Sequence, residues 1–85
     1  MSGLLSPFAA DVVGMIGSAL MVIAYAYSNL AARINFLAFN LLNLVGSLLL
    51  IASLSVHFNL ASMALEIVWA LIALLGLAKF AAKRA

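Results

Sequence analysis

Three apolar stretches of about twenty residues each largely decide how this chain can fold. They cover residues 8–28, 36–55 and 60–80, and only short connections separate them. A helix of about 20 apolar residues crosses the hydrocarbon core of a bilayer. Of the 85 residues, 69% are hydrophobic and 7% are charged, which is too little polar sequence to cover a soluble domain. We therefore predict an all-α membrane protein, a single domain over 1–85 with three transmembrane helices.

Few residues in the chain offer reactive chemistry. There is no cysteine, and the one histidine, His57, falls at the end of a span, where it is most simply an interfacial polar residue. No catalytic triad, paired carboxylates or phosphate-binding loop occurs in the sequence. We expect no enzyme, no cofactor and no metal site. The four basic residues are also too few for binding to nucleic acid, which depends on many phosphate contacts.

One acid interrupts the third apolar stretch about two turns inside it. A charged residue at the bilayer centre costs about 2.5–3.5 kcal/mol on insertion scales, so such a residue is a functional candidate that needs a partner. Burial favours the neutral acid, which can donate a hydrogen bond to an asparagine or a serine. The residue is Glu66. Three roles are open for it: a clip between helices, the handling of a solute or proton, and contact with a partner protein.

Polar residues of the other spans reach the depth of this acid. At about 1.5 Å of rise per residue, Ser18 and Ser47 lie at a similar level, and Asn43 lies level with Trp69. We therefore predict one polar midplane cluster, which would bind a substrate if there is one. Its members are Ser18, Asn43, Ser47, Glu66 and Trp69.

Glycines mark the faces on which helices can approach closely. In lipid, small residues let neighbouring backbones pack, so Gly14, Gly17 and Gly46 are predicted helix-packing positions. They serve either the packing of this chain or contact with another membrane protein.

Two resemblances add to this interpretation. The segments Asp11-Val-Val-Gly-Met-Ile-Gly-Ser18, Asn40-Leu-Leu-Asn-Leu-Val-Gly-Ser47 and Ala61-Ser-Met-Ala-Leu-Glu-Ile-Val-Trp69 resemble a poorly characterised family of small bacterial three-helix membrane proteins that are labelled permeases. The length and architecture are also similar to the SemiSWEET and PQ-loop proteins, although Pro7 is the only proline and no Pro-Gln pair occurs. That similarity implies dimers of three-helix bundles that transport small solutes. It also implies a spatial order of one, three, two, with Glu66 on the central helix.

Two functions follow as hypotheses. The first is a SemiSWEET-like transporter of a small solute in the bacterial inner (cytoplasmic) membrane, which acts as a homodimer around the polar midplane cluster. The alternative is a non-catalytic accessory subunit that packs against a larger membrane complex through its glycine faces. Both have membrane lipid as a partner.

The basic residues predict the orientation. One lies between the first two spans and three follow the third, so all fall on the cytoplasmic side if the N-terminus is outside and the C-terminus inside. They form a predicted cytoplasmic anchor: Arg33, Lys79, Lys83 and Arg84. A reporter that is active only in the cytoplasm should therefore work when fused after Arg84. An inactive fusion there, together with an active one at His57, would reverse the assignment.

Overall fold

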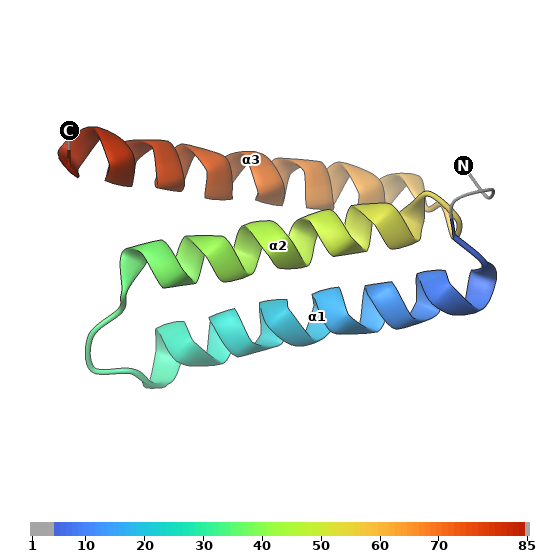
Figure 1. Cartoon of the computed structure of the whole chain (residues 1–85), viewed down its shortest axis with the longest axis horizontal. Helices are drawn as coiled ribbons and strands as arrows, with labels where there is room; N and C mark the ends of the chain where they lie inside the picture. Colours follow the sequence, from blue (N-terminus) through green and yellow to red (C-terminus); the bar gives the residue numbers. More distant parts are fainter. Residues whose placement is uncertain (1–4, 85) are drawn as a thin grey trace.

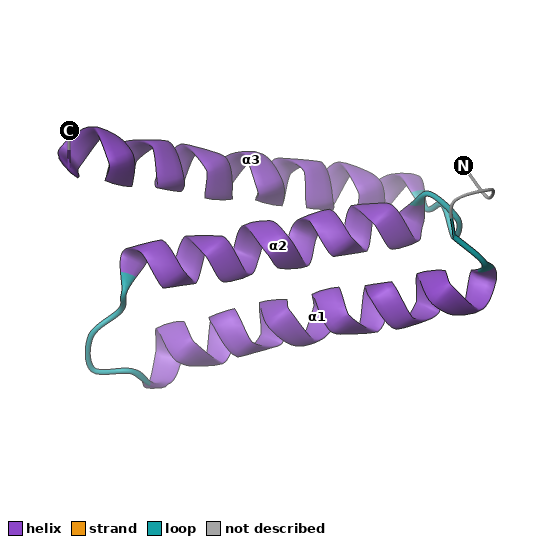
Figure 2. Cartoon of the chain, in the orientation of Figure 1, coloured by secondary structure: helices purple, strands orange, loops and turns teal. Residues whose placement is uncertain are grey.

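The computed structural model describes residues 5–84, which form three long helices joined by short connections (Figures 1 and 2). The helices are α1 (Pro7–Leu30), α2 (Phe36–Leu54) and α3 (Leu60–Arg84), and the described residues contain no strand. All three are long and apolar enough to cross a membrane. The prediction of an all-helical, three-span protein is thus confirmed.

Side chains of serine and asparagine set the start of each helix. The backbone N–H of Ala9 donates to Ser6 Oγ at 3.0 Å, and Pro7 follows as the first helical residue. In the same way Asn35 accepts from the Ala38 N–H at 3.1 Å. Asn59 accepts from the Ser62 N–H at 3.0 Å. Each cap satisfies a donor that the first turn of a helix leaves without a carbonyl partner.

The helices lie in one layer with α2 in the middle (Figure 1). Helix α2 packs against both neighbours, whereas α1 and α3 do not pack against each other within residues 5–84. The order one, three, two that the SemiSWEET resemblance implied is therefore wrong, and Glu66 lies on an outer helix. The physical reason lies in α2, which makes close contacts on two sides: Gly46 meets Gly17 of α1, and the buried Asn40 and Asn43 meet Gly76 and Trp69 of α3.

Helices α1 and α2 approach most closely at two glycines. An added Cβ on Gly17 would lie 2.8 Å from the backbone oxygen of Gly46, and one on Gly46 would lie 3.0 Å from the oxygen of Gly17. Ala10 and Ala24 are buried on α1 with Gly17, two turns to either side of it. This spacing of seven residues forms one stripe of small residues along which the two backbones pack.

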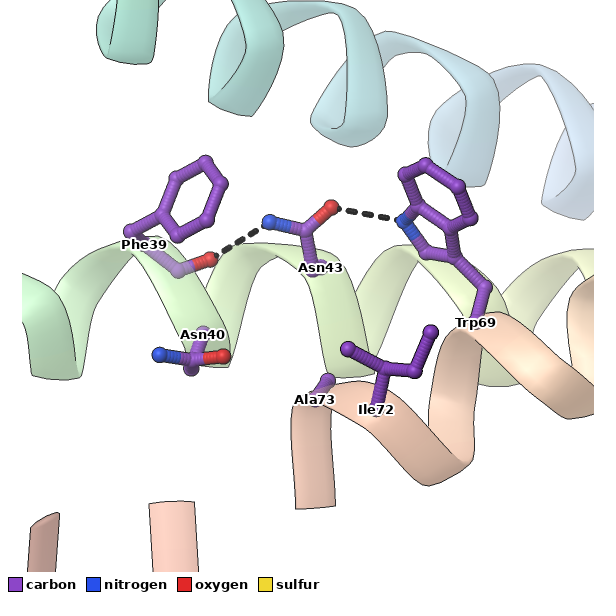
Figure 3. A pocket seen from close by; sticks show the side chains of 6 residues that line it. All are labelled: Phe39, Asn40, Asn43, Trp69, Ile72 and Ala73. Carbon is purple, nitrogen blue, oxygen red and sulfur yellow. Dashed lines mark hydrogen bonds between the residues drawn. The ribbon is translucent and has the colours of Figure 1, made fainter. Parts of the chain in front are cut away.

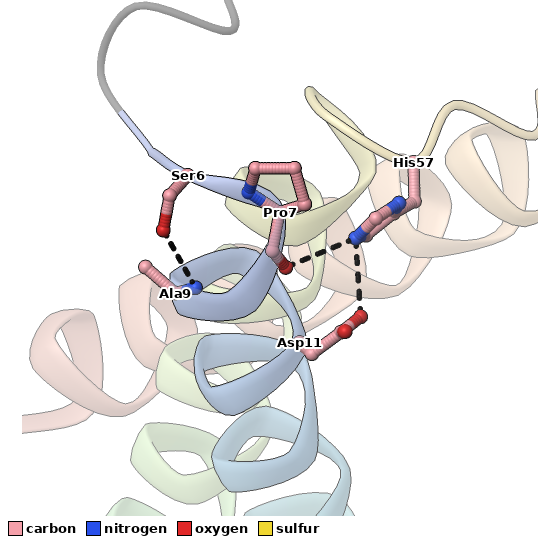
Figure 4. Close-up of polar contacts among 5 residues, drawn as sticks. All are labelled: Ser6, Pro7, Ala9, Asp11 and His57. Atoms are coloured by element: carbon pink, nitrogen blue, oxygen red, sulfur yellow. Dashed lines mark hydrogen bonds and ion pairs between the residues drawn. The ribbon is translucent and has the colours of Figure 1, made fainter.

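A polar contact joins the start of α1 to the turn between α2 and α3 (Figure 4). His57 Nε2 lies 3.1 Å from Asp11 Oδ1 and 3.3 Å from the carbonyl oxygen of Pro7. Both side chains of the pair are largely exposed, so it is worth at most about 1 kcal/mol. No pattern in the sequence predicts this contact between residues that are 46 positions apart.

Gly17 and Gly14 offer a matched test of the close approach. Both lie in α1, so alanine gains the same helix propensity at each. At Gly17 the new methyl group would meet backbone, while at Gly14 it would meet chiefly the Ser53 side chain, which can rotate. We expect Gly17→Ala to lower the free energy of unfolding in detergent by about 1–3 kcal/mol, and Gly14→Ala by clearly less. Equal losses would contradict a backbone contact at Gly17.

Candidate polar site between α2 and α3

The site begins with two asparagines of α2 that are buried in the apolar layer. Asn40 is 6% exposed and Asn43 is 8% exposed. Each amide nitrogen donates to a carbonyl one turn earlier in its own helix, Asn40 to Phe36 and Asn43 to Phe39, both at 2.9 Å. These internal bonds fix the two side chains and leave their amide oxygens to face α3.

The oxygen of Asn43 receives a hydrogen bond from the neighbouring helix. Trp69 reaches across from α3, and its indole Nε1–H donates to Asn43 Oδ1 at 2.9 Å (Figure 3). Trp69 itself is 42% exposed, so part of the ring faces outward. The bond therefore holds an aromatic wall in a fixed position beside the seam between α2 and α3.

A groove of about 240 Å³ lies next to this bond. Apolar side chains provide most of its surface, and two amides provide the polar groups. Its lining residues are Phe39, Asn40, Asn43, Trp69, Ile72 and Ala73 (Figure 3). The groove has room for a small solute beside the Trp69 ring, and of its polar groups the amide oxygen of Asn40 is the one not used in a hydrogen bond among residues 5–84.

Small residues of α3 bring this helix close to the amides. Ala70 and Ala73 are buried, at 7% and 2% exposure. A Cβ added to Gly76 would clash with the side-chain oxygen of Asn40. Asn40 and Gly76 were not among the predicted site residues. The spacing of three between Ala70, Ala73 and Gly76 was the available signal for this small-residue face of α3.

Glu66 lies one turn before Trp69 and Ala70 on the same helix, beside Ser47 of α2. Ser47 is fully buried and is the polar neighbour of the Glu66 carboxyl group. The Ser47 Oγ also lies 4.0 Å from the sulfur of Met21 on α1. Glu66 Oε1 is buried and has no hydrogen-bond partner within residues 5–84. A buried polar atom left in this way costs about 1–3 kcal/mol, so the site has an unused polar group.

The structure brings together four of the five residues of the predicted cluster. They form two neighbouring pairs along one seam, Asn43 with Trp69 and Ser47 with Glu66. Ser18 lies apart from them on the exposed side of α1, which does not pack against α3. It follows Gly17 directly, so it points about 100° away from the buried stripe of α1.

The glycines and basic residues occupy other places. The interface between α1 and α2 of this chain contains the three predicted helix-packing glycines, Gly14, Gly17 and Gly46. Lys79 and Lys83 line a second cavity, Arg33 is exposed in the connection between α1 and α2, and Arg84 ends α3. Over residues 5–84, no three His, Cys, Asp or Glu side chains gather as metal ligands would.

A protein-family model matches residues 10–84, which include all of α2 and α3 and most of α1. No curated protein and no solved structure matches the sequence significantly. The similarity to SemiSWEET proteins and permeases thus stays a prediction from the sequence.

The bond between Trp69 and Asn43 should be visible as energetic coupling. In a double-mutant cycle with Asn43→Leu and Trp69→Phe, we expect a coupling of about 0.6 kcal/mol or more, because interhelical hydrogen bonds in membranes average near that value. The measurement is the free energy of unfolding in detergent. Asn43→Leu with Ser18→Ala is the control pair, which should be additive. Coupling in the control pair, or none between Asn43 and Trp69, would contradict the contact.

Proposed function

The chain belongs to the family whose model matches residues 10–84, and we propose that it is a multi-pass protein of the bacterial inner membrane that binds and moves a small solute as a homodimer. The solute site is the seam of Asn43, Ser47, Glu66 and Trp69. No reaction is catalysed, and neither a cofactor nor a metal takes part. The N-terminus lies outside and the C-terminus inside, in line with the distribution of lysine and arginine.

The observation that carries this proposal is the groove beside the bond between Asn43 and Trp69. A membrane helix that only anchors a protein has no need for an acid with an unpaired oxygen within its span. Here the amides border a volume of about 240 Å³, and the unpaired Glu66 oxygen lies about one turn before Trp69 on α3. A solute with a hydroxyl or amine group would supply the missing hydrogen bond and stack on Trp69.

The need for a second copy follows from the shape of the layer. Three helices side by side enclose no passage, and the groove between α2 and α3 is open along one side. A second chain laid against this face closes the groove and doubles the polar site. The interface would be isologous, which is the commonest arrangement in soluble homodimers.

A subunit of a larger membrane complex is the second candidate. It is favoured by the outer face of α1, where Ser18 is exposed and Tyr25 is 73% exposed, with no hydrogen bond from either hydroxyl to another of the described residues. Polar groups on such a face are expected to meet protein rather than lipid. The glycines give this candidate less support than expected from the sequence. Gly17 and Gly46 pack on each other within the chain, so they are not available as contact faces for another protein.

Particle mass after gentle extraction from the native membrane separates the two candidates. A protein mass of twice the 8.9 kDa chain supports the homodimer. A far larger particle with other subunits supports the accessory role and would overturn the proposal.

Solute uptake into proteoliposomes tests the site itself. A panel of small polar solutes, sugars among them, is offered to the wild-type protein, and saturable uptake of at least one is expected. Asn43→Leu removes both the amide and the fixed position of Trp69, so it should reduce this uptake by at least about tenfold, which corresponds to about 1.4 kcal/mol. Glu66→Gln keeps shape and hydrogen bonding, so it should preserve assembly while abolishing any proton-coupled step.

Ser18→Ala is the matched control, because it removes a polar group at a similar depth outside the seam. Solute uptake by the Ser18→Ala variant should equal that of the wild type. If Ser18→Ala and Asn43→Leu lower uptake equally, or if the wild type moves no solute of the panel, the proposed site is wrong.

A further inference from the structure

A second cavity, of about 200 Å³, lies at the end of the seam where α2 begins and α3 ends. Two aromatic rings and two lysines line it, namely Phe36, Phe80, Lys79 and Lys83. The rings are stacked with their centroids 6.5 Å apart and their planes at 29°. The cavity thus combines an apolar wall with two cationic groups, a combination that neither of the candidate functions uses.

The charged side chains that line this cavity are both cationic. Lys79 and Lys83 are one turn apart on α3, where like charges repel each other. The first turn of α2, which starts at Phe36, adds partial positive charge, and the end of α3 adds partial negative charge that offsets only part of the charge of the lysines. The two acidic residues of the sequence are far away: Asp11 pairs with His57 at the opposite end, and Glu66 lies 13 positions before Lys79. An anion in the cavity would therefore relieve the repulsion.

The position of the cavity selects the kind of anion. Helices α2 and α3 are membrane spans, so the end of their seam lies at the level of the lipid headgroups. We propose that the cavity binds the headgroup phosphate of one anionic phospholipid. Lys79 and Lys83 hold the phosphate, and Phe36 and Phe80 contact the glycerol and the first carbons of the acyl chains. Basic pockets between spans on the cytoplasmic side are suited to such headgroups.

This site differs from a general attraction of basic residues to the membrane. Arg33 lies at the same end of the layer, in the connection between α1 and α2, but it does not line the cavity. Arg33 therefore contributes positive charge to the same end of the protein as the two lysines, but it is not part of the cavity. The proposal does not depend on solute transport, because either candidate function leaves the cavity in place.

Native mass spectrometry of the full chain tests the site. The delipidated protein in neutral detergent is titrated with dioleoyl phosphatidylglycerol and, separately, with dioleoyl phosphatidylcholine. We expect one phosphatidylglycerol per chain, bound at least about fivefold more tightly than phosphatidylcholine. The double variant Lys79→Gln with Lys83→Gln should lose this preference, and Lys79→Arg with Lys83→Arg should keep it. Helicity by circular dichroism shows that each variant is folded.

Arg33→Gln is the control that separates a site from surface charge. It should bind phosphatidylglycerol as the wild type does, whereas Lys79→Gln alone should weaken binding severalfold. Equal losses in these two single variants would overturn the proposal, as would equal binding of the two lipids by the wild type. Inorganic phosphate is added as a competitor. If millimolar phosphate displaces the lipid completely, the cavity is a site for free anions and the assignment to a lipid is wrong.

Discussion

The burial of polar groups on α2 is the constraint on which the rest of the layer depends. Asn40, Asn43 and Ser47 are nearly or fully buried in a helix that is otherwise apolar. In hydrocarbon no water can satisfy such groups, so protein must cover them. Helix α3 covers the two asparagines with Trp69 and with the small-residue face of Ala70, Ala73 and Gly76, and the sulfur of Met21 on α1 lies near Ser47. The contact between Gly46 and Gly17 of α1 adds a second close approach, so α2 has a partner on each side and lies in the centre.

The extent and ends of the helices could be predicted from sequence because they depend on local properties. Apolar length set the spans, and Ser6 and Asn35 mark helix starts through bonds to their own backbone. The lateral order could not be predicted in this way. Small residues occur on all three helices, and the sequence does not say which small face meets which. The SemiSWEET resemblance supplied an order, and it was wrong because it set α3 in the middle, whereas α2 is the helix that packs against both others.

For the site, the sequence predicts how deep a residue lies along its helix better than it predicts the side of the helix on which the residue lies. Rise per residue placed Asn43 level with Trp69 and Ser47 level with Glu66, and these pairs are neighbours in the structure. Depth alone also placed Ser18 in the predicted cluster, whereas in the structure Ser18 is exposed on the outer face of α1. The error is one of direction around the helix axis, since Gly17 and not Ser18 faces α2. The contact of Asp11 with His57 lay beyond such reasoning, because it depends on how a turn folds back over the start of α1.

The unpaired oxygen of Glu66 links the proposed dimer to the proposed solute site. Trp69 and Asn43 satisfy each other, and the amide nitrogens of Asn40 and Asn43 are bound within α2. Glu66 Oε1 alone among the buried side-chain polar atoms of residues 5–84 has no partner. The energetic cost, about 1–3 kcal/mol, persists until a hydrogen-bonding group reaches this oxygen. A second chain that permanently satisfied this oxygen would close the site to a solute. In the proposed dimer, a contact that covers the groove and leaves this oxygen unpaired is less stable by that cost, and the same free energy is then available to bind a solute.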